Sequence, residues 1–309
     1  MSLKYNAVAI ESDLNIAVLS LSETNLVVGK TWDPKVRMQT STEKACVFSD
    51  GVLTHIDVGQ SFNSTAHSVG ENNVIVGTGT PSSKFGVFGW VEENGVVTRL
   101  DGLGGTNVMA TATNGRIHCG QANLPNRVSR AVKWENGQCV DLGTLGGPGA
   151  YASAINKKGS IVGSSRTSAS NMTMCGFIFS NGKMMALPSP TPNDRSFAYN
   201  LNENDDVVGA INGGWTAVKW EKAEKPIILV HSQSQAFDIN NNGMVVGSAG
   251  NPGYAFVHDG KTLYNLNDIT EGLNGINLNT ARSINNQGCI AAYGFNSRFA
   301  MKAFLLIPA

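Results

Sequence analysis

The chain has 309 residues, of which 41% are hydrophobic and only 15% are charged, with 23 basic and 23 acidic side chains. This composition excludes a disordered chain, because disorder accompanies low hydrophobicity and high net charge. The balanced charge and the lack of long Lys/Arg runs argue against a nucleic-acid partner. No stretch reaches the roughly 20 consecutive apolar residues that span a bilayer, so no membrane span is expected.

The N-terminal segment, residues 3–12 with the sequence LKYNAVAIES, is predicted to be a strand. It lacks the continuous apolar run and the small-residue cleavage site of a secretion signal. The residues themselves therefore leave the compartment open.

From this point a unit of about 45 residues recurs along the chain. Its first half reads Ala-x-x-Ile-Asn-x-x-Gly-x-Val-Val-Gly and is clearest at 150–163 and 235–247. The Asn-x-x-Gly tetrapeptide predicts a tight turn between two short strands. The seven copies end, in chain order, at Gly29, Gly77, Gly120, Gly163, Gly209, Gly247 and Ala292.

The recurring Asn is expected to serve that turn. An Asn that opens a tight turn usually bonds its own backbone two residues on, so we favour this role over presentation of the amide to a ligand. The residues concerned are Asn156, Asn202, Asn240 and Asn285.

The second half of the unit follows after a gap of variable length. Alternating apolar residues flank Asn-Gly or Asp-Gly, which tolerate positive φ and fit the primed turns of β-hairpins. Each unit is therefore predicted to be two hairpins, or four antiparallel strands. The dipeptides are Asp50-Gly51, Asn94-Gly95, Asn136-Gly137, Asn181-Gly182 and Asp259-Gly260.

Seven such units predict an all-β fold, a seven-bladed β-propeller of four-stranded blades that forms a single domain over 1–309. The last unit, which ends in AMKAFLLIPA at 300–309, lacks its fourth strand. The N-terminal segment 3–12 can supply that strand, and the ring would then have no open edge. A six-bladed ring with irregular ends is the alternative.

The repeats also resemble a known family. DLGTLGG at 141–147, its weaker copy at 100–105 and the recurring Ala-x-x-Ile-Asn pattern are similar to the HAF repeat of bacterial proteins described as probable extracellular repeat proteins. The His-Ala-Phe triplet itself is absent, and only two copies keep the Leu-Gly-Gly ending. The resemblance implies a propeller-like array that is extracellular or on the cell surface, and it brings no catalytic residues.

The five cysteines form no CxxC pair and no Cys/His cluster with zinc-ligand spacing, so neither a metal nor a cofactor is indicated. Four of them replace apolar or small residues of sister repeats. Free buried thiols are therefore favoured over disulfides. The cysteines are Cys46, Cys119, Cys139, Cys175 and Cys289.

Function is expected on the face of the ring that carries the loops between strands two and three of each blade and the connections between blades. These segments vary widely in length, and variable loops on a rigid scaffold are the usual place for binding. The longest are 31–44 and 267–280. Aromatic and Arg residues suit recognition because they offer contact area and bidentate hydrogen bonds. The candidate binding residues are Trp32, Lys35, Arg37, Arg127, Arg166, Arg195, Trp215, His231, Tyr254, Asp268 and Arg298.

Three functions remain open. The first is a non-enzymatic binding module, expected to be a monomer, for a glycan, peptide or protein. The second is a carbohydrate-active hydrolase or lyase, whose acid/base groups would converge at the mouth of the central channel; no known catalytic motif is present. The third is a secreted effector-type interaction scaffold. His67 and His231 are further candidates near the variable face, and the enzyme hypothesis draws on Asp194, Arg195, His231, Asp268 and Glu271.

Overall fold

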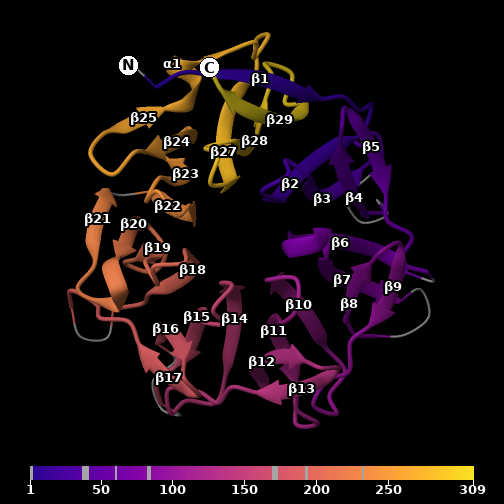
Figure 1. The fold of residues 1–309 in the computed structure, drawn as a ribbon, viewed down its shortest axis with the longest axis vertical. Helices are drawn as coiled ribbons and strands as arrows, with labels where there is room; N and C mark the ends of the chain where they lie inside the picture. Colours follow the sequence, from indigo (N-terminus) through magenta and orange to yellow (C-terminus); the bar gives the residue numbers. More distant parts are fainter. Residues whose placement is uncertain are drawn as a thin grey trace.

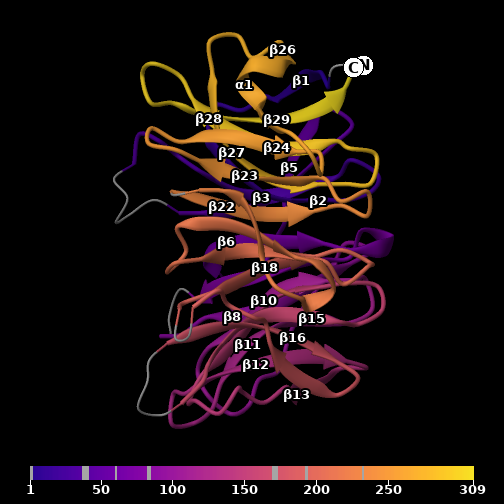
Figure 2. The same cartoon turned by 90° about the vertical axis from the view of Figure 1, so that its left-hand side faces the viewer.

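The structure is a computed structural model that describes residues 3–36, 42–59, 61–81, 85–168, 173–191, 194–231 and 233–309. Seven small antiparallel sheets stand around a common axis (Figure 1). Figure 2 shows the same ring from the side, with the ends of the strands gathered on two opposite faces. The predicted seven-bladed β-propeller is confirmed, and the six-bladed alternative is wrong.

Blades 1 to 4 follow one another along the chain, each with its first strand nearest the axis (Figure 1). Blade 1 contains β2 (Asn15–Leu21), β3 (Val27–Trp32), β4 (Lys44–Ser49) and β5 (Val52–His55). Blade 2 contains β6 (Ser61–Val69), β7 (Ile75–Pro81), β8 (Phe88–Glu93) and β9 (Val96–Arg99). Blade 3 contains β10 (Val108–Thr113), β11 (His118–Asn123), β12 (Ser129–Glu135) and β13 (Gln138–Asp141). Blade 4 contains β14 (Ala150–Ile155), β15 (Ile161–Arg166), β16 (Met174–Ser180) and β17 (Lys183–Ala186).

Blades 5 and 6 repeat this order, and short helical turns lie only in connections. Blade 5 contains β18 (Phe197–Leu201), β19 (Val207–Ile211), β20 (Thr216–Trp220) and β21 (Ile227–Val230). Blade 6 contains β22 (Ser234–Ile239), β23 (Val245–Ala249), β24 (Tyr254–His258) and β25 (Leu263–Asn265). The helical turns are η1 (Glu71–Asn73), η2 (Glu221–Ala223) and α1 (Leu266–Ile269).

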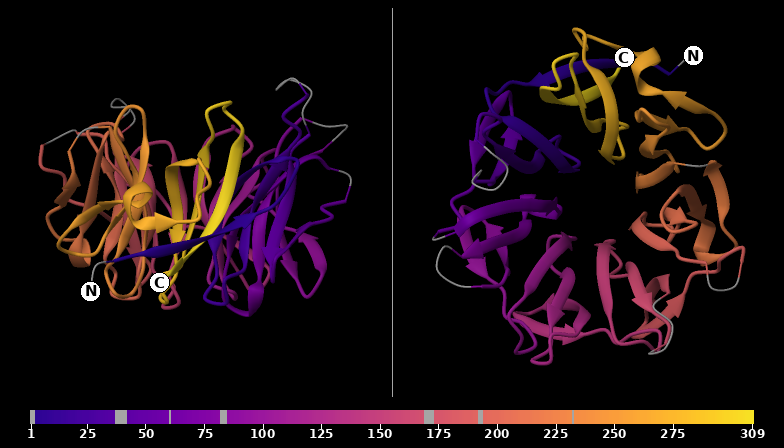
Figure 3. Two further views of the ribbon diagram at one scale, coloured as in Figure 1. Left: turned by 90° about the horizontal axis from the view of Figure 1, so that it is seen from above. Right: turned by 180° about the vertical axis from the view of Figure 1, so that it is seen from behind.

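Blade 7 is built from both ends of the chain. It contains β27 (Asn277–Ile284), β28 (Ile290–Phe295), β29 (Met301–Pro308) and the N-terminal β1 (Tyr5–Ile10). β1 runs antiparallel to β29, with Tyr5 opposite Pro308 and Ile10 opposite Ala303. Figure 3 shows the two ends of the chain close to each other on this blade. The predicted closure is confirmed. The segment 267–280 is not simply the long loop that we expected, because it contains α1 and β26 (Thr270–Glu271), a fifth strand that pairs in parallel with β1.

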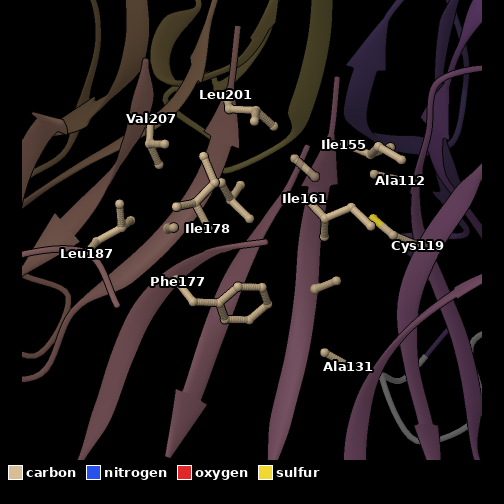
Figure 4. Packing of buried hydrophobic residues seen from close by; sticks show 14 of the residues in the cluster. Ala112, Cys119, Ala131, Ile155, Ile161, Phe177, Ile178, Leu187, Leu201 and Val207 are labelled. Carbon is tan, nitrogen blue, oxygen red and sulfur yellow. The ribbon is translucent and has the colours of Figure 1, made fainter. Parts of the chain in front are cut away.

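The cores lie between neighbouring blades. Around blade 4, Ile161, Phe177 and Leu187 pack in one cluster with residues of blades 3 and 5 (Figure 4). All five cysteines are free thiols; three are buried and Cys139 and Cys175 are half-buried, in agreement with the prediction.

A β-bulge interrupts the innermost strand at the same place in all seven blades, directly after the recurring Ala or its equivalent Val18. The bulge brings a backbone carbonyl over the Gly that ends the repeat pattern. A Cβ on Gly163 would lie 2.1 Å from the Tyr151 oxygen, and one on Gly120 would lie 1.9 Å from the Met109 oxygen. In blades 1 to 6 the repeated Gly therefore leaves the space that this carbonyl occupies and that a Cβ would need.

The recurring Asn serves both its own turn and the next blade. The Oδ1 atom of Asn240 accepts hydrogen bonds from the backbone of Asn242 and Met244, which confirms the predicted turn role. Its Nδ2 atom donates to the carbonyl of Asn285, 3.0 Å away in blade 7. Asn114, Asn156, Asn202 and Asn285 donate in the same way, each to the blade that follows. This series of hydrogen bonds from Asn side chains to the next blade was not foreseen from the sequence.

Candidate functional site

The bulged residues of the seven innermost strands form a ring around the axis. Each bulge inserts one extra residue whose side chain lines a cavity of about 560 Å³, which we call the channel cavity. Side chains from every blade contribute to its wall. The ring consists of Leu19, His67, Thr111, Ser153, Tyr199, Phe237 and Arg282.

The wall contributed by blades 5 to 7 is aromatic and cationic. The rings of Tyr199 and Phe237 lie 5.9 Å apart, and Phe197 stacks on Tyr199 at 6.4 Å. The guanidinium of Arg282 lies 4.5 Å from the centre of the Phe237 ring. The Gln235 amide nitrogen donates to the Tyr199 hydroxyl at 3.2 Å. The rest of the ring consists of Leu19, His67, Thr111 and Ser153, so the aromatic side chains lie together on one side of the cavity.

Within the described ranges the Arg282 guanidinium forms neither an ion pair nor a hydrogen bond to another side chain. The Asp238 carboxylate of the neighbouring strand β22 lines the same cavity, and the opposite charges of the two groups act on each other without direct contact. Burial lowers the pKa of Arg282 from its usual value, and the group still carries its charge at neutral pH because guanidinium is so weakly acidic. The wall therefore presents a positive charge with free N–H donors.

Asp238 joins three blades. Its carboxylate accepts hydrogen bonds from the Asn200 amide at 2.6 Å and the Ser283 hydroxyl at 2.7 Å. The backbone N–H groups of Ile239 and Ile284 donate to it as well, at 2.8 and 2.9 Å. Burial raises the pKa of Asp238 to about 6, while these donors act in the opposite direction. Four donors occupy the carboxylate, so it holds blades 5, 6 and 7 together.

His67 lies across the ring on blade 2. Its Nε2 atom is 2.9 Å from the Thr78 hydroxyl. Burial, together with the positive charges of Lys30 and Arg282, lowers the pKa of His67 to about 4. The imidazole is therefore neutral at pH 7, with one nitrogen able to accept and the other to donate.

The two ends of the channel differ in charge. On the side of the turns between first and second strands, a cavity of about 500 Å³, the turn-side cavity, is lined by Glu23, Glu71 and Glu203 together with Lys157, which is paired with Glu71 at 2.7 Å. On the opposite side, a cavity of about 320 Å³, the loop-side cavity, lies between blades 3 and 4. Its lining includes two arginines and Tyr151, which also lines the channel cavity.

The structure brings together part of the predicted binding set. Arg127 and Arg166 both line the loop-side cavity. Burial raises the pKa of the Tyr151 hydroxyl, and the positive charges of Arg195 and Arg166 partly oppose this rise. Arg127 and Arg166 therefore lie with Tyr151 in one cavity at the loop-side end of the channel, and Arg195 adds a positive charge to the same region.

The other predicted binding residues are dispersed over the molecule. Trp32 is half-buried at the end of β3 under the Lys30 ammonium, 5.9 Å away, and Trp215 is 64% exposed. Arg37 lies outside the described residues. Tyr254 is half-buried at the start of β24, and the remaining exposed positions are Lys35, His231, Asp268 and Arg298.

The expected convergence of acid/base groups at the channel mouth is wrong for two of its members. Asp268 lies in α1, and Glu271 lies in β26, the outermost strand of blade 7. Asp194 accepts hydrogen bonds from the Asn212 backbone and the Ser189 hydroxyl. None of the five predicted acid/base residues lines the channel cavity. The connection between blades 6 and 7 lies at the outer edge of blade 7 because β26 pairs with β1. The spacing of the sequence repeats does not reveal this pairing.

Sequence analysis missed Tyr199, Phe237 and Arg282. A signal was present, because the residue after the recurring Ala is the most variable in chemistry among the seven copies. Its direction could not be read from strand alternation, since the bulge turns that residue toward the axis. In the described parts of the chain no group of three or more His, Cys, Asp or Glu residues is placed to hold a metal ion. No described helix is long and apolar enough to cross a membrane.

Comparison with known proteins supports the fold and goes no further. No family model and no curated protein matches the chain, so the resemblance to HAF repeats stays a prediction. Among solved structures, the β-propeller domain of the Trilobed protease from Pyrococcus furiosus matches with a TM-score of 0.62 and 9% identity, over 96% of this chain and 98% of that one. Virginiamycin B lyase from Staphylococcus aureus matches with a TM-score of 0.59 and 9% identity, over 99% of both chains. An acylaminoacyl peptidase from Pyrococcus horikoshii matches with a TM-score of 0.57 and 9% identity, over 94% of this chain and 51% of that one. At such identities the likeness shows the propeller fold alone.

Proposed function

We propose that the protein is a non-enzymatic binding module that holds its ligand in the channel cavity. The observation that carries this proposal is the wall of Tyr199, Phe237 and Arg282, with rings 5.9 Å apart and a guanidinium that forms no ion pair among the described side chains. Binding pockets combine flat apolar surface with a few convergent polar groups. A cavity of about 560 Å³ is large enough for one or two sugar rings or a short peptide segment.

The carboxylates of the cavity favour binding over hydrolysis. Asp238 is occupied by four hydrogen-bond donors, and Glu23, the other carboxylate in the lining, bonds the Asn286 amide at 2.5 Å and its backbone N–H at 3.1 Å. Glycoside hydrolysis generally needs one carboxylic acid and one carboxylate on either side of the bond. Neither of these two groups is free to act in that way.

The test is a glycan and peptide array followed by calorimetry on the ligands found. Phe237→Ala removes the ring that links Tyr199 to Arg282 and is expected to weaken binding at least tenfold, as loss of a central aromatic anchor does. Trp215→Ala is the matched control, because this exposed aromatic lies outside the channel cavity. Loss of binding in Trp215→Ala with no change in Phe237→Ala would move the site to the outer loops and refute the proposal.

A second candidate function is a lyase, and the observation that favours it is His67. Its neutral imidazole can accept a proton from a ligand in the channel, although a pKa of about 4 makes it a weak base at neutral pH. Mass spectrometry of the bound ligand after incubation tests this alternative. Bond cleavage that disappears in His67→Gln while binding persists would establish catalysis, and an intact ligand supports the binding module.

A further inference from the structure

The loop-side end of the channel is a cationic entrance without acidic counterparts. Arg127 and Arg166 line the loop-side cavity together with Tyr151, and the charge of Arg195 also acts on the Tyr151 hydroxyl. Within the described residues none of these three guanidinium groups forms an ion pair or a side-chain hydrogen bond. By contrast, the nearby Arg130 is paired with Asp141 at 3.0 Å. Asp194, the acidic neighbour of Arg195 in sequence, accepts hydrogen bonds from Asn212 and Ser189 instead.

This entrance borders the channel cavity. Tyr151 lines both the loop-side cavity and the channel cavity, so a ligand held at the entrance lies next to the channel. The turn-side cavity carries three glutamates against one lysine. An anion is therefore attracted to the loop side and repelled from the turn side, which gives the channel a direction.

We propose that the ligand is an oligosaccharide that carries anionic groups, and that Arg127, Arg166 and Arg195 bind those groups at the loop-side entrance. The proposal rests on the function proposed above and names its substrate class. Arginine forms bidentate bonds with carboxylates and sulfates, while the faces of Tyr199 and Phe237 fit the apolar face of a sugar ring. The ligand enters from the loop side with an anionic group at Arg166 and a sugar ring toward the channel cavity.

A sugar chain fits this channel better than an acidic peptide. A peptide in extended form binds a sheet by adding a strand to a regular edge. Here a bulge breaks the inner edge of all seven blades, for example between Ala198 and Asn200. The innermost strands therefore present their side chains to a ligand, and they lack the uninterrupted row of backbone hydrogen-bonding groups that an added peptide strand needs.

The experiment is calorimetric titration of the full chain with a hexameric oligouronate, a sulfated hexasaccharide, the methyl-esterified oligouronate and hexaglutamate. At least one anionic sugar is expected to bind ten or more times tighter than the esterified chain, with affinity that falls as salt rises. Uronate or sulfate preference then identifies the anionic group.

Arg166→Gln and Arg195→Gln are each expected to weaken that binding about tenfold, as loss of one charged hydrogen-bond partner does. Arg116→Gln is the matched control, because Arg116 is an exposed arginine of blade 3 in the turn between β10 and β11. It is expected to change affinity less than twofold.

Three outcomes would overturn the inference: equal binding of the charged and esterified chains, binding insensitive to both arginine substitutions, or hexaglutamate binding as tightly as the sugars. If a neutral ligand binds and Phe237→Ala abolishes its binding, the anionic class is wrong and the binding function stands. If no array ligand depends on Phe237, the proposed function fails as well.

Discussion

His67 and Asp238 line the same cavity and respond to burial in opposite ways. Burial disfavours the charged form of each, which lowers the pKa of the imidazole to about 4 and raises the pKa of the carboxyl to about 6. In the unfolded chain the two groups titrate near 6.5 and 3.8. As pH falls from 6.5 toward 4, His67 destabilises the fold because the unfolded chain binds its proton first. As pH falls from 6 toward 4, Asp238 stabilises the fold because the folded chain binds its proton first.

Single substitutions should separate these two contributions, each on the order of 1 to 3 kcal/mol. Between pH 7 and pH 4.5, His67→Gln is expected to lose less stability than the wild type, and Asp238→Asn is expected to lose more. Urea unfolding at pH 7, 5.5 and 4.5 measures both. Pairing the two variants with the wild type at each pH controls for the other titrating groups. Identical pH dependence in all three proteins would show that neither group is desolvated as described.

At the scale of the strand, the bulge and the glycine opposite it belong together structurally. The bulge directs one residue per blade toward the axis, and its displaced carbonyl occupies the space where a Cβ would stand. Blade 7 is informative because Ala292 replaces the glycine there. In that blade a further bulge lies between Leu278 and Thr280, and the close carbonyl, that of Asn277, is 1.9 Å from the Cβ position of Gly294 instead. The glycine therefore occurs where a backbone carbonyl lies close, even when this is not the position that the repeat pattern predicts.

Gly163→Ala should therefore destabilise the protein by about 3 kcal/mol or more, because Tyr151 oxygen and the new Cβ cannot both keep their places. The matched control is Gly149→Ala in the same blade, where the nearest atom, the Ser129 oxygen, lies at 3.6 Å, an ordinary contact. That exchange is expected to stay within about 1 kcal/mol of wild type. Thermal and urea unfolding of both variants give the comparison, and equal stabilities would contradict the steric role of the glycine.

At the scale of the whole molecule, closure depends on β1. Tyr5 and Ile10 of this strand are 0% and 1% exposed, and the strand covers the edge of β29 that would otherwise be open. The series of Asn side-chain hydrogen bonds between blades crosses the same junction, since the Asn285 amide of blade 7 donates to the carbonyl of Ser22 in blade 1 at 3.1 Å. Both contacts join the ends of the ring.

Removal of residues 1–11 should therefore destabilise the propeller by on the order of 5 kcal/mol, from the burial of two large side chains alone. A circular permutant that begins at residue 12 and continues from Ala309 through an Asn-Gly turn into residues 4–11 is the control. Ala309 already donates a backbone hydrogen bond to the carbonyl of Lys4 at 3.0 Å, so the turn needs little rearrangement. Calorimetry should show a lower Tm for the deletion and recovery in the permutant. A deletion as stable as wild type would mean that the strand adds nothing to closure.

The sequence by itself determined the architecture of this protein. Blade number, four strands per blade, the hairpin turns at dipeptides such as Asn136-Gly137 and the closing strand all follow from short-range rules of turn chemistry and from counting a repeat. The free thiols and the turn role of Asn240 follow from alignment of the seven repeats, because residues at equivalent positions of the repeats have similar surroundings.

Only the tertiary structure decided where the chemistry lies. A bulge reverses the direction that strand alternation predicts, so Tyr199, Phe237 and Arg282, which share one position in the repeat, meet at the axis. The tertiary structure also places Asp268 and Glu271 at the outer edge of the ring, and it brings Arg127 and Arg166 from two blades into one cavity. The physical reason is that a repeat encodes each blade through local contacts, while the site is made between blades, where distances depend on closure of the whole ring.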